Sequence, residues 1–248
     1  MKLAPPFRQD GDHIAAELPG ARALFTTRRG GVSAGPYASL NLGLWTDDEP
    51  ANVHRNRDRL AGLAGVERRR FAQGRQVHGA EVRALRAPPD PDEEPAPADG
   101  QASSVAGVAP VVLVADCLPI ALAVPGAVAM LHAGWRGLAG GVVEAGVRAV
   151  RELGGSGDII AAIGPGAGGC CYEVGEEVHA AFAAHGGAVR RGRSLDLKAI
   201  AVRDLRAAGV SAVYDVGICT ICADPELFYS HRRDGGVTGR QAGVVWRV

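Results

Sequence analysis

The sequence lacks any excess of charge of one sign. It holds 27 Lys and Arg residues against 27 Asp and Glu residues over 248 positions. This balance gives no long-range attraction to nucleic acid or to an anionic membrane, so neither is expected as a partner. Aromatic residues are also scarce at 5%, whereas 35 residues are glycine. Such a composition favours a loop-rich chain that mixes helices with strands over a helical bundle.

Segments typical of an export signal or a bilayer span are also lacking. Residues 1–20 carry three prolines and several charges where a signal peptide has an apolar core. The most apolar region, residues 105–135, is interrupted by Asp116, Pro119 and Pro125. We therefore expect a cytoplasmic protein whose five cysteines are reduced thiols and not a disulfide framework.

The pattern of apolar residues predicts strands and helices intermingled along the chain. Strands are expected at residues 23–27, 108–115, 120–124 and 128–131, with two short ones within 69–85, one starting near 158 and one within 211–219. Helices are expected within 48–65, over 139–154, near 175–185 and within 196–210. The proline- and acid-rich stretch 87–100 is expected to be a surface loop. Together these elements predict a single α+β domain over residues 1–248, with a mixed β-sheet flanked by helices.

Cys117 and His132 stand at the two ends of an apolar stretch that reverses near Pro125-Gly126. If residues 120–131 form a hairpin with a two-residue or a centred four-residue turn, these two residues finish opposite each other or offset by two. Either register places both side chains on one face, roughly 5–8 Å apart at Cβ. A three-residue loop would break this parity.

A thiol beside an imidazole supports two kinds of chemistry. One is a Cys-His nucleophile, in which the imidazole draws the thiol toward thiolate. The other is a metal site, because thiolate and imidazole are the ligands that zinc prefers. A catalytic zinc needs a third protein ligand and an open position, and His78, in a turn-like break between apolar residues, is the candidate. Taken alone, a cysteine after a buried strand is most often a small core residue.

The sequence motifs of the chain resemble those of a known family over most of its length. The motifs that carry the resemblance are TTRRGGVSAGPYASLNLG, NVHRNR, QVHGAEV, ADCLP, HAGWRG, IGP followed by CCYEVGEEV, and FYSHRRDGGVTGRQAG, in this order. Together they resemble the YfiH-like family, also called the laccase-domain family, from about residue 20 to the C-terminus. The resemblance implies an α+β fold of the YfiH type. It also implies a mononuclear zinc held by His78, Cys117 and His132.

Members of this family are understood as purine nucleoside enzymes. The resemblance implies phosphorolysis of adenosine, inosine, guanosine and methylthioadenosine, with phosphate as co-substrate, and deamination of adenosine at the same site. Zinc with an open coordination position lowers the pKa of a bound water toward ~7. The resulting hydroxide is the nucleophile that deamination needs. The His-x-Glu and later Pro-Cys-x-x-Cys pattern of base deaminases is absent. A different general acid or base is therefore needed, and Asp116 is the nearest carboxylate.

The same motifs contain the candidate substrate contacts. The resemblance implies contacts from Asn41 and Arg57. Arg136 offers a planar fork for phosphate, and Trp135 offers a stacking surface, although a tryptophan after a glycine turn is as often a packing residue. The SHRRD run adds Arg232 or Arg233 as a phosphate anchor, while a solvated charged loop is the more common meaning of such a run.

The remaining cysteines are expected to be structural or redox-silent. Cys219 and Cys222 form one C-x-x-C without a partner pair, and Ile221 between them suggests burial. The adjacent Cys170 and Cys171 are too close in sequence for an ordinary disulfide and are expected to be reduced.

Two alternatives to the zinc enzyme stay open at the level of sequence. The first is a metal-free hydrolase, with Cys117 as nucleophile and His132 as base, acting on an amide such as one met in peptidoglycan editing. The second is copper-dependent phenol oxidation, which has also been connected with the family. Multicopper sites need many His ligands, and this chain has seven His with no His-x-His pair. Copper is therefore not expected.

Overall fold

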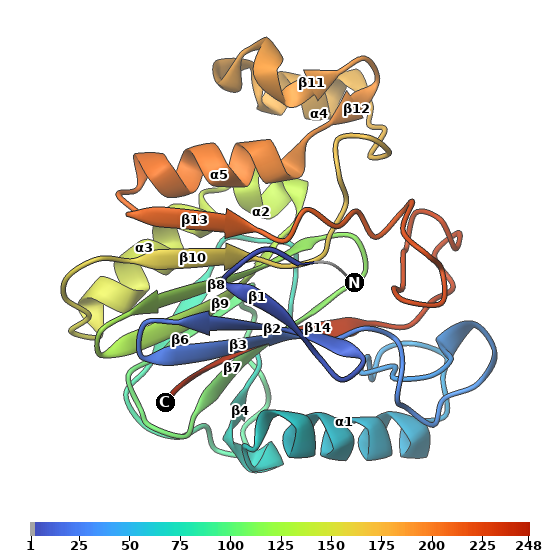
Figure 1. Cartoon of the computed structure of the whole chain (residues 1–248), viewed down its shortest axis with the longest axis vertical. Helices are drawn as coiled ribbons and strands as arrows, with labels where there is room; N and C mark the ends of the chain where they lie inside the picture. The colour runs from blue at the N-terminus through green and yellow to red at the C-terminus, as the bar shows by residue number, and fades with distance from the viewer. Residues whose placement is uncertain (1–2) are drawn as a thin grey trace.

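Two six-stranded mixed sheets form the body of the protein in the computed structural model, which describes residues 3–248 (Figure 1). The first sheet has, in spatial order, β1 (Phe7–Asp10), β2 (His13–Leu18), β3 (Ala21–Phe25), β14 (Gln241–Arg247), β7 (Ala109–Val114) and β4 (Phe71–Ala72). The second has β13 (Ala212–Asp215), β10 (Ile160–Ile163), β8 (Leu118–Val124), β9 (Ala127–Ala133), β6 (Gly100–Ser103) and β5 (Val82–Leu85). A small third sheet pairs β11 (Arg190–Arg191) with β12 (Ser194–Leu195).

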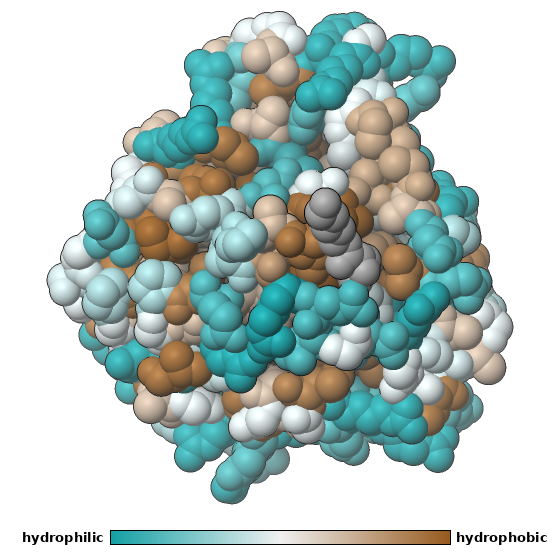
Figure 2. Space-filling view, viewed as in Figure 1, coloured by the Kyte–Doolittle hydropathy of each residue, from teal (hydrophilic) through white to brown (hydrophobic). Residues whose placement is uncertain are grey.

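Helices cover the outer faces of both large sheets. The α-helices are α1 (Pro50–Ala64), α2 (Trp135–Ala139), α3 (Val142–Glu152), α4 (Glu176–Ala181) and α5 (Leu197–Ala207). Short 3-10 turns are η1 (Gly35–Tyr37), η2 (Arg68–Arg70), η3 (Ala183–His185) and η4 (Gly187–Val189). In Figure 1, α1 lies below the first sheet, α5 lies above the second, and α3 is drawn at the left, level with β10, while α4, β11 and β12 project beyond α5. Figure 2 shows that hydrophilic side chains cover much of this projecting segment.

The two sheets pack face to face, so the chain forms four layers: helix, sheet, sheet, helix. In β8, Leu118 and Ile120 point into the core beneath α3 and α5, whereas Ala121 and Ala123 point into the core between the sheets. A third core joins the first sheet to α1. A strand buried on both faces needs apolar residues at every position, which explains the continuous apolar runs in the sequence.

The expected α+β class is confirmed, with one refinement of its architecture. The helices expected within 48–65, over 139–154 and within 196–210 correspond to α1, α3 and α5, and that near 175–185 to the shorter α4. The chain forms two large mixed sheets where the sequence analysis expected one. The additional sheet depends on β1, β2 and β14, three strands at the chain ends that periodicity did not separate from loops.

No helix within residues 3–248 combines the length and the apolar character needed to cross a bilayer.

Candidate functional site

The β8–β9 hairpin brings Cys117 and His132 to one face at its open end. Its turn is the two-residue Pro125-Gly126, because Val124 pairs with Ala127 in the ladder. Pro119 pairs with His132, so Cys117 lies two residues beyond the partner of His132. Side chains two residues apart share a face. The predicted parity is therefore confirmed, with the offset of two.

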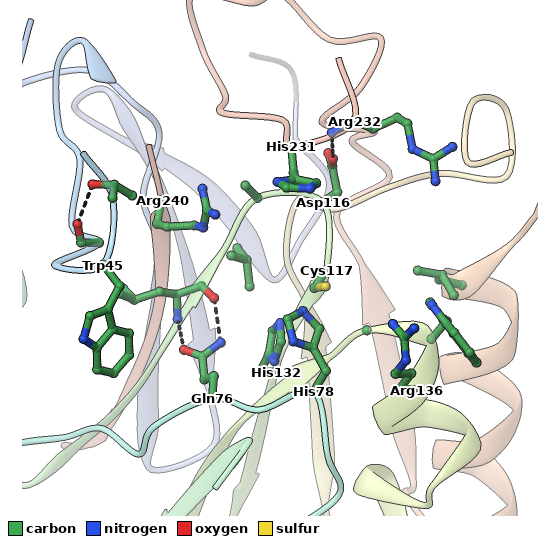
Figure 3. Close-up of a pocket in the computed structure, with 18 of the residues that line it drawn as sticks. Trp45, Gln76, His78, Asp116, Cys117, His132, Arg136, His231, Arg232 and Arg240 are labelled. Carbon is green, nitrogen blue, oxygen red and sulfur yellow. Dashed lines mark hydrogen bonds between the residues drawn. The ribbon is translucent and has the colours of Figure 1, made fainter. Parts of the chain in front are cut away.

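His78 joins these two residues from the loop between β4 and β5 (Figure 3). The donor atoms of His78, Cys117 and His132 all lie within 4.8 Å of one another. The two imidazole rings meet edge to face, with centroids 4.9 Å apart. His132 is buried, while Cys117 is partly exposed and His78 is exposed on the side of the pocket. One thiol and two imidazoles at this spacing could hold a single metal ion.

Asp99 fixes two members of this group at once. The ring of His132 donates from Nδ1 to Asp99 Oδ1 at 2.7 Å, which leaves Nε2 of His132 for a ligand. The same carboxylate accepts from the backbone N–H groups of Val77, His78 and Gly79 at 3.1, 2.9 and 2.7 Å. Burial raises the pKa of Asp99, but the hydrogen bonds from His132, Gly79 and Val77 outweigh it and hold the pKa below its usual value. A carboxylate behind a ligating histidine is the usual way to orient the ring and increase its basicity.

Gly134 leaves the space in which the thiol and the imidazole meet. A Cβ at this position would lie 2.9 Å from Cys117 Sγ and 3.4 Å from His78 Cδ2. The first distance is too short for any side chain without movement of the sulfur. The glycine of HAGWRG is thus required by the close approach of Cys117 and His78.

Two residues of the site have a backbone conformation that is rare outside glycine. Among the described residues, only His78 and Asp116 combine a positive φ with a side chain, at 59° and 89°. Conformations of this kind cost of order 1–3 kcal/mol and persist where surrounding contacts fix them. For His78 those contacts come from Asp99.

The contacts at Asp116 come from its own carboxylate. Oδ1 accepts from Thr220 Oγ1 at 2.7 Å, and Oδ2 accepts from Ser230 Oγ at 3.0 Å and from the backbone N–H of Arg232 at 2.8 Å. These bonds tie the residue before Cys117 to two distant loops. Asp116 lines the pocket, but three donors engage its oxygens.

Cys117 and His132 each shift the pKa of the other. Burial raises the pKa of Cys117, but the charge of His132 and hydrogen bonds from His132 and His78 outweigh it and bring the pKa to about 6. Burial lowers the pKa of His132, but Cys117 and Asp99 outweigh it and raise the pKa to about 9. A thiolate facing an imidazolium is therefore the expected state at neutral pH. A thiolate is also the form of cysteine that binds metals.

A pocket of about 410 Å³ opens above these residues. This volume lies within the usual range for small-molecule sites. The pocket is lined by three arginines, Arg136, Arg232 and Arg240, and by His231 (Figure 3). Tyr172 is also among the lining residues. The sequence analysis did not identify Arg240 or His231, whose position depends on the C-terminal segment returning beside β7.

Arg136 and Trp135 enter the pocket from the start of α2. The Arg136 guanidinium lies 4.3 Å from the centroid of the Trp135 ring, a cation–π contact. Trp135 also packs against the core beneath the helices, so it combines a packing role with a surface in the pocket.

Asn41 does not line the pocket. It is fully buried, its side-chain nitrogen donates to Thr46 Oγ1 and Asp48 Oδ2, and its oxygen accepts from the backbone N–H groups of Gly43 and Arg240. Asn41 therefore positions the backbone of Arg240, which lines the pocket, without lining the pocket itself.

Arg57 is not among the residues that line this pocket either. Its Nε donates to the carbonyl of Leu42 at 2.9 Å, and it lines a second cavity of about 490 Å³. Burial, with repulsion from Arg68, lowers its pKa to about 10.

The two arginines of SHRRD have different surroundings. Arg233 donates to the carbonyls of Thr220 and Phe228 and to the carboxylate of Asp234, so its guanidinium is engaged within the fold. Arg232 lines the pocket and lies 5.2 Å from the centroid of Tyr172. Of the pair, Arg232 is the one that lines the pocket, and its guanidinium also donates to the carbonyl of Glu173 at 2.6 Å.

The structure corrects the statement that the C-x-x-C of Cys219 and Cys222 has no partner pair. The sulfurs of Cys170, Cys171, Cys219 and Cys222 all lie within 4.8 Å of one another. An isolated parallel bridge between Gly166 and Cys219 brings the two loops together. The partner pair was missed because its two cysteines are adjacent and about fifty residues away.

Comparison with known proteins gives a consistent result over nearly the whole chain. Residues 22–248 match the family model described as multi-copper polyphenol oxidoreductase laccase. A protein of Xylella fastidiosa named purine nucleoside phosphorylase is 43% identical over 92% of this chain and 93% of its own length.

Two solved structures extend the comparison to the fold. The crystal structure of YlmD from Geobacillus stearothermophilus superposes with a TM-score of 0.88 at 37% identity, covering 98% of each chain. YfiH of Bacillus licheniformis superposes with a TM-score of 0.87 at 28% identity, covering 99% of this chain and 100% of that one.

Proposed function

This chain belongs to the multi-copper polyphenol oxidoreductase laccase family, and from that premise we propose that it is a purine nucleoside phosphorylase. The observation that carries the proposal is a three-ligand group, His78, Cys117 and His132, that opens into a pocket with three guanidinium groups. A relative that shares 43% of its residues over most of both chains is named for this activity.

The group fits one zinc ion. Its donor set is one thiolate and two imidazoles, Asp99 orients the His132 ring with Nε2 toward the other donors, and Gly134 leaves the space that the sulfur needs. When bound, zinc supplies Lewis-acid chemistry at its open coordination position. Multi-copper oxidation requires more histidines: the two candidate ligand groups found within residues 3–248 contain two His in all.

The pocket arginines suit the second substrate of phosphorolysis. Arg136, Arg232 and Arg240 surround one cavity with positive charge, and guanidinium groups bind phosphate oxygens through paired hydrogen bonds. A phosphate held there attacks C1′ of the ribose, and the bond from C1′ to the purine nitrogen breaks. Its electron pair leaves with the base, which takes up a proton. We assign the supply of that proton to His231, the pocket imidazole outside the three-ligand group.

The same pocket supports a broad set of purine nucleosides. We propose adenosine, inosine, guanosine and methylthioadenosine as substrates, with the base or ribose near Trp135. Deamination of adenosine is proposed as a second reaction, in which water adds to C6 of the adenine ring, the C6–N bond breaks and the amino group leaves as ammonia. Asp116 serves this chemistry as a positioning residue, because Thr220, Ser230 and Arg232 already engage its carboxylate.

Product analysis by mass spectrometry tests these reactions. The zinc-loaded protein is incubated with adenosine, with and without phosphate, beside Cys117→Ala. Phosphorolysis predicts adenine and ribose 1-phosphate only in the presence of phosphate. Deamination predicts inosine without phosphate, and inosine together with hypoxanthine, its phosphorolysis product, with phosphate. All of these products are expected to vanish with Cys117→Ala. Products that persist in that variant would place the chemistry elsewhere.

A second candidate function is a metal-free cysteine hydrolase. The coupled thiolate and imidazolium of Cys117 and His132 favour it, because this pair is the resting state of many cysteine nucleophiles. An alkylating probe separates the two functions. A catalytic nucleophile is labelled at neutral pH in the protein as purified, whereas a thiolate that binds zinc reacts only after chelation.

A further inference from the structure

The four cysteines outside the pocket form a group of their own on two neighbouring loops. Cys170 and Cys171 follow β10 in the loop that leads to α4, and Cys219 and Cys222 follow β13. Cys170 and Cys222 are exposed, and the other two are partly exposed. We call these residues the four-cysteine cluster.

We propose that the four-cysteine cluster is a second metal site, closed by four thiolates and built for one tetrahedral ion of the zinc class. The proposal concerns a different part of the molecule from the His78–Cys117–His132 group. It does not depend on the function assigned to the pocket.

The spacing of the sulfurs matches a single tetrahedral ion. With Zn–S bonds of ~2.3 Å, the sulfurs of a four-thiolate site are ~3.8 Å apart. Cys170 Sγ lies 3.7 Å from Cys222 Sγ and 3.5 Å from Cys171 Sγ, and every pair in the cluster lies within 4.8 Å. Four free thiols have no reason to converge in this way, since thiol–thiol hydrogen bonds are weak.

Backbone groups around the cluster are arranged for a thiolate. The N–H of Gly168 donates to Cys219 Sγ at 3.2 Å. A Cβ on Gly168 would lie 3.2 Å from Cys170 Sγ and 3.1 Å from Cys219 Cβ, so a glycine permits the approach of both loops.

The position of the cluster gives the ion a structural task. Thr220, next to Cys219, donates to the carboxylate of Asp116, and Tyr172, next to Cys171, lines the pocket. An ion shared by the two loops therefore fixes the residue that precedes Cys117 and one wall of the pocket together. A four-thiolate site leaves no open position, which is the usual arrangement of structural zinc.

Metal analysis of the folded full-length protein tests the proposal. Wild type, Cys117→Ala, Cys222→Ser and Cys170→Ser are purified under reducing conditions, freed of loose metal and assayed for zinc per chain by mass spectrometry. Cys117→Ala is the matched control, because it removes the fifth cysteine and leaves the cluster intact. We expect it to retain one equivalent of zinc, which is lost when Cys222→Ser or Cys170→Ser is added to it.

A spectroscopic measurement keeps the test independent of the serine variants. Cobalt replaces zinc in Cys117→Ala, and the near-ultraviolet sulfur-to-cobalt charge-transfer band reports thiolate ligands without reference to activity. An intense band that saturates at one equivalent supports the four-thiolate site. Cys117→Ala that binds neither zinc nor cobalt when reduced overturns it, as does zinc content that Cys222→Ser and Cys170→Ser leave unchanged.

Discussion

Two groups of side chains in this chain that could hold a metal ion differ in what surrounds them. The His78–Cys117–His132 group has three donors, is oriented from behind by Asp99 and opens into a pocket of about 410 Å³. The four-cysteine cluster has four donors on two loops, and none of its cysteines is among the residues that line that pocket. An open three-ligand site is suited to catalysis, and a closed four-ligand site is suited to structure. The number of donors and the access to them, and not the presence of cysteine, distinguish the two.

The largest difference is expected from removing one sulfur at each group. Cys117→Ala should reduce kcat/KM for adenosine phosphorolysis by on the order of 10³-fold or more, since it removes a ligand and the chemistry that the ion supplies. Cys222→Ser should lower the thermal midpoint and reduce kcat/KM far less. Steady-state kinetics and thermal unfolding of both variants check the contrast. Equal losses of activity would remove the distinction between the two groups.

The pKa of Cys117 tests whether its thiol is paired with His132. In the chelated protein its pKa of about 6 keeps the thiolate at neutral pH, and the thiolate is lost as the pH falls through 6. The rate of alkylation at Cys117 should therefore reach half its maximum near pH 6, about three pH units below an ordinary thiol of pKa near 9. Peptide mapping after iodoacetamide treatment across pH 4–10 gives this midpoint. A midpoint near 9 would contradict the pairing with His132.

Asp99→Asn tests how much the hydrogen bonds of Asp99 contribute to the His78–Cys117–His132 group. An amide can still contact the His132 ring, but it accepts fewer hydrogen bonds from the loop and no longer stabilises the ring's charge. Residues in this position typically contribute 10–100-fold to metal affinity or activity. Zinc affinity by chelator competition should fall by about that factor. The control is Asp92→Asn, the same change on an exposed residue of the same loop, which should leave the affinity unchanged.

The smallest effect is expected from a single arginine of the pocket. Arg240→Gln should raise KM for phosphate about tenfold, because one of three guanidinium groups and its charged hydrogen bonds are lost. Arg148→Gln removes an exposed arginine of α3 and serves as the control. An unchanged KM for phosphate in Arg240→Gln would direct attention to Arg136 and Arg232 alone.

The sequence was sufficient for features set by local rules. The shared face of Cys117 and His132 was expected for a turn of two or four residues, and the two-residue turn at Pro125-Gly126 confirms it. The apolar periodicities of α1, α3 and α5 were clear for the same reason. The ligand set that the resemblance implies, with His78 as its third member, corresponds to donor atoms that lie within 4.8 Å of one another.

Other features depend on contacts between distant segments, and local patterns did not reveal them. Asp99 ends a stretch so rich in acid and proline that the whole stretch reads as solvated, yet its side chain is fully buried. Asn41 and Arg57 lie within motifs of the family, but their side chains make contacts outside the pocket. The four-cysteine cluster forms only because β10 and β13 pair in parallel, which carries their following loops to the same end of the sheet.

The central claim is that phosphate cleaves a purine nucleoside in the pocket above His78, Cys117 and His132. Phosphorus NMR tests it directly, by following adenosine and inorganic phosphate with zinc-loaded wild type, Cys117→Ala and Cys222→Ser in parallel. The account predicts a growing ribose 1-phosphate signal with wild type and Cys222→Ser, and none with Cys117→Ala. A signal that grows equally with Cys117→Ala, or that never appears with wild type, would contradict it.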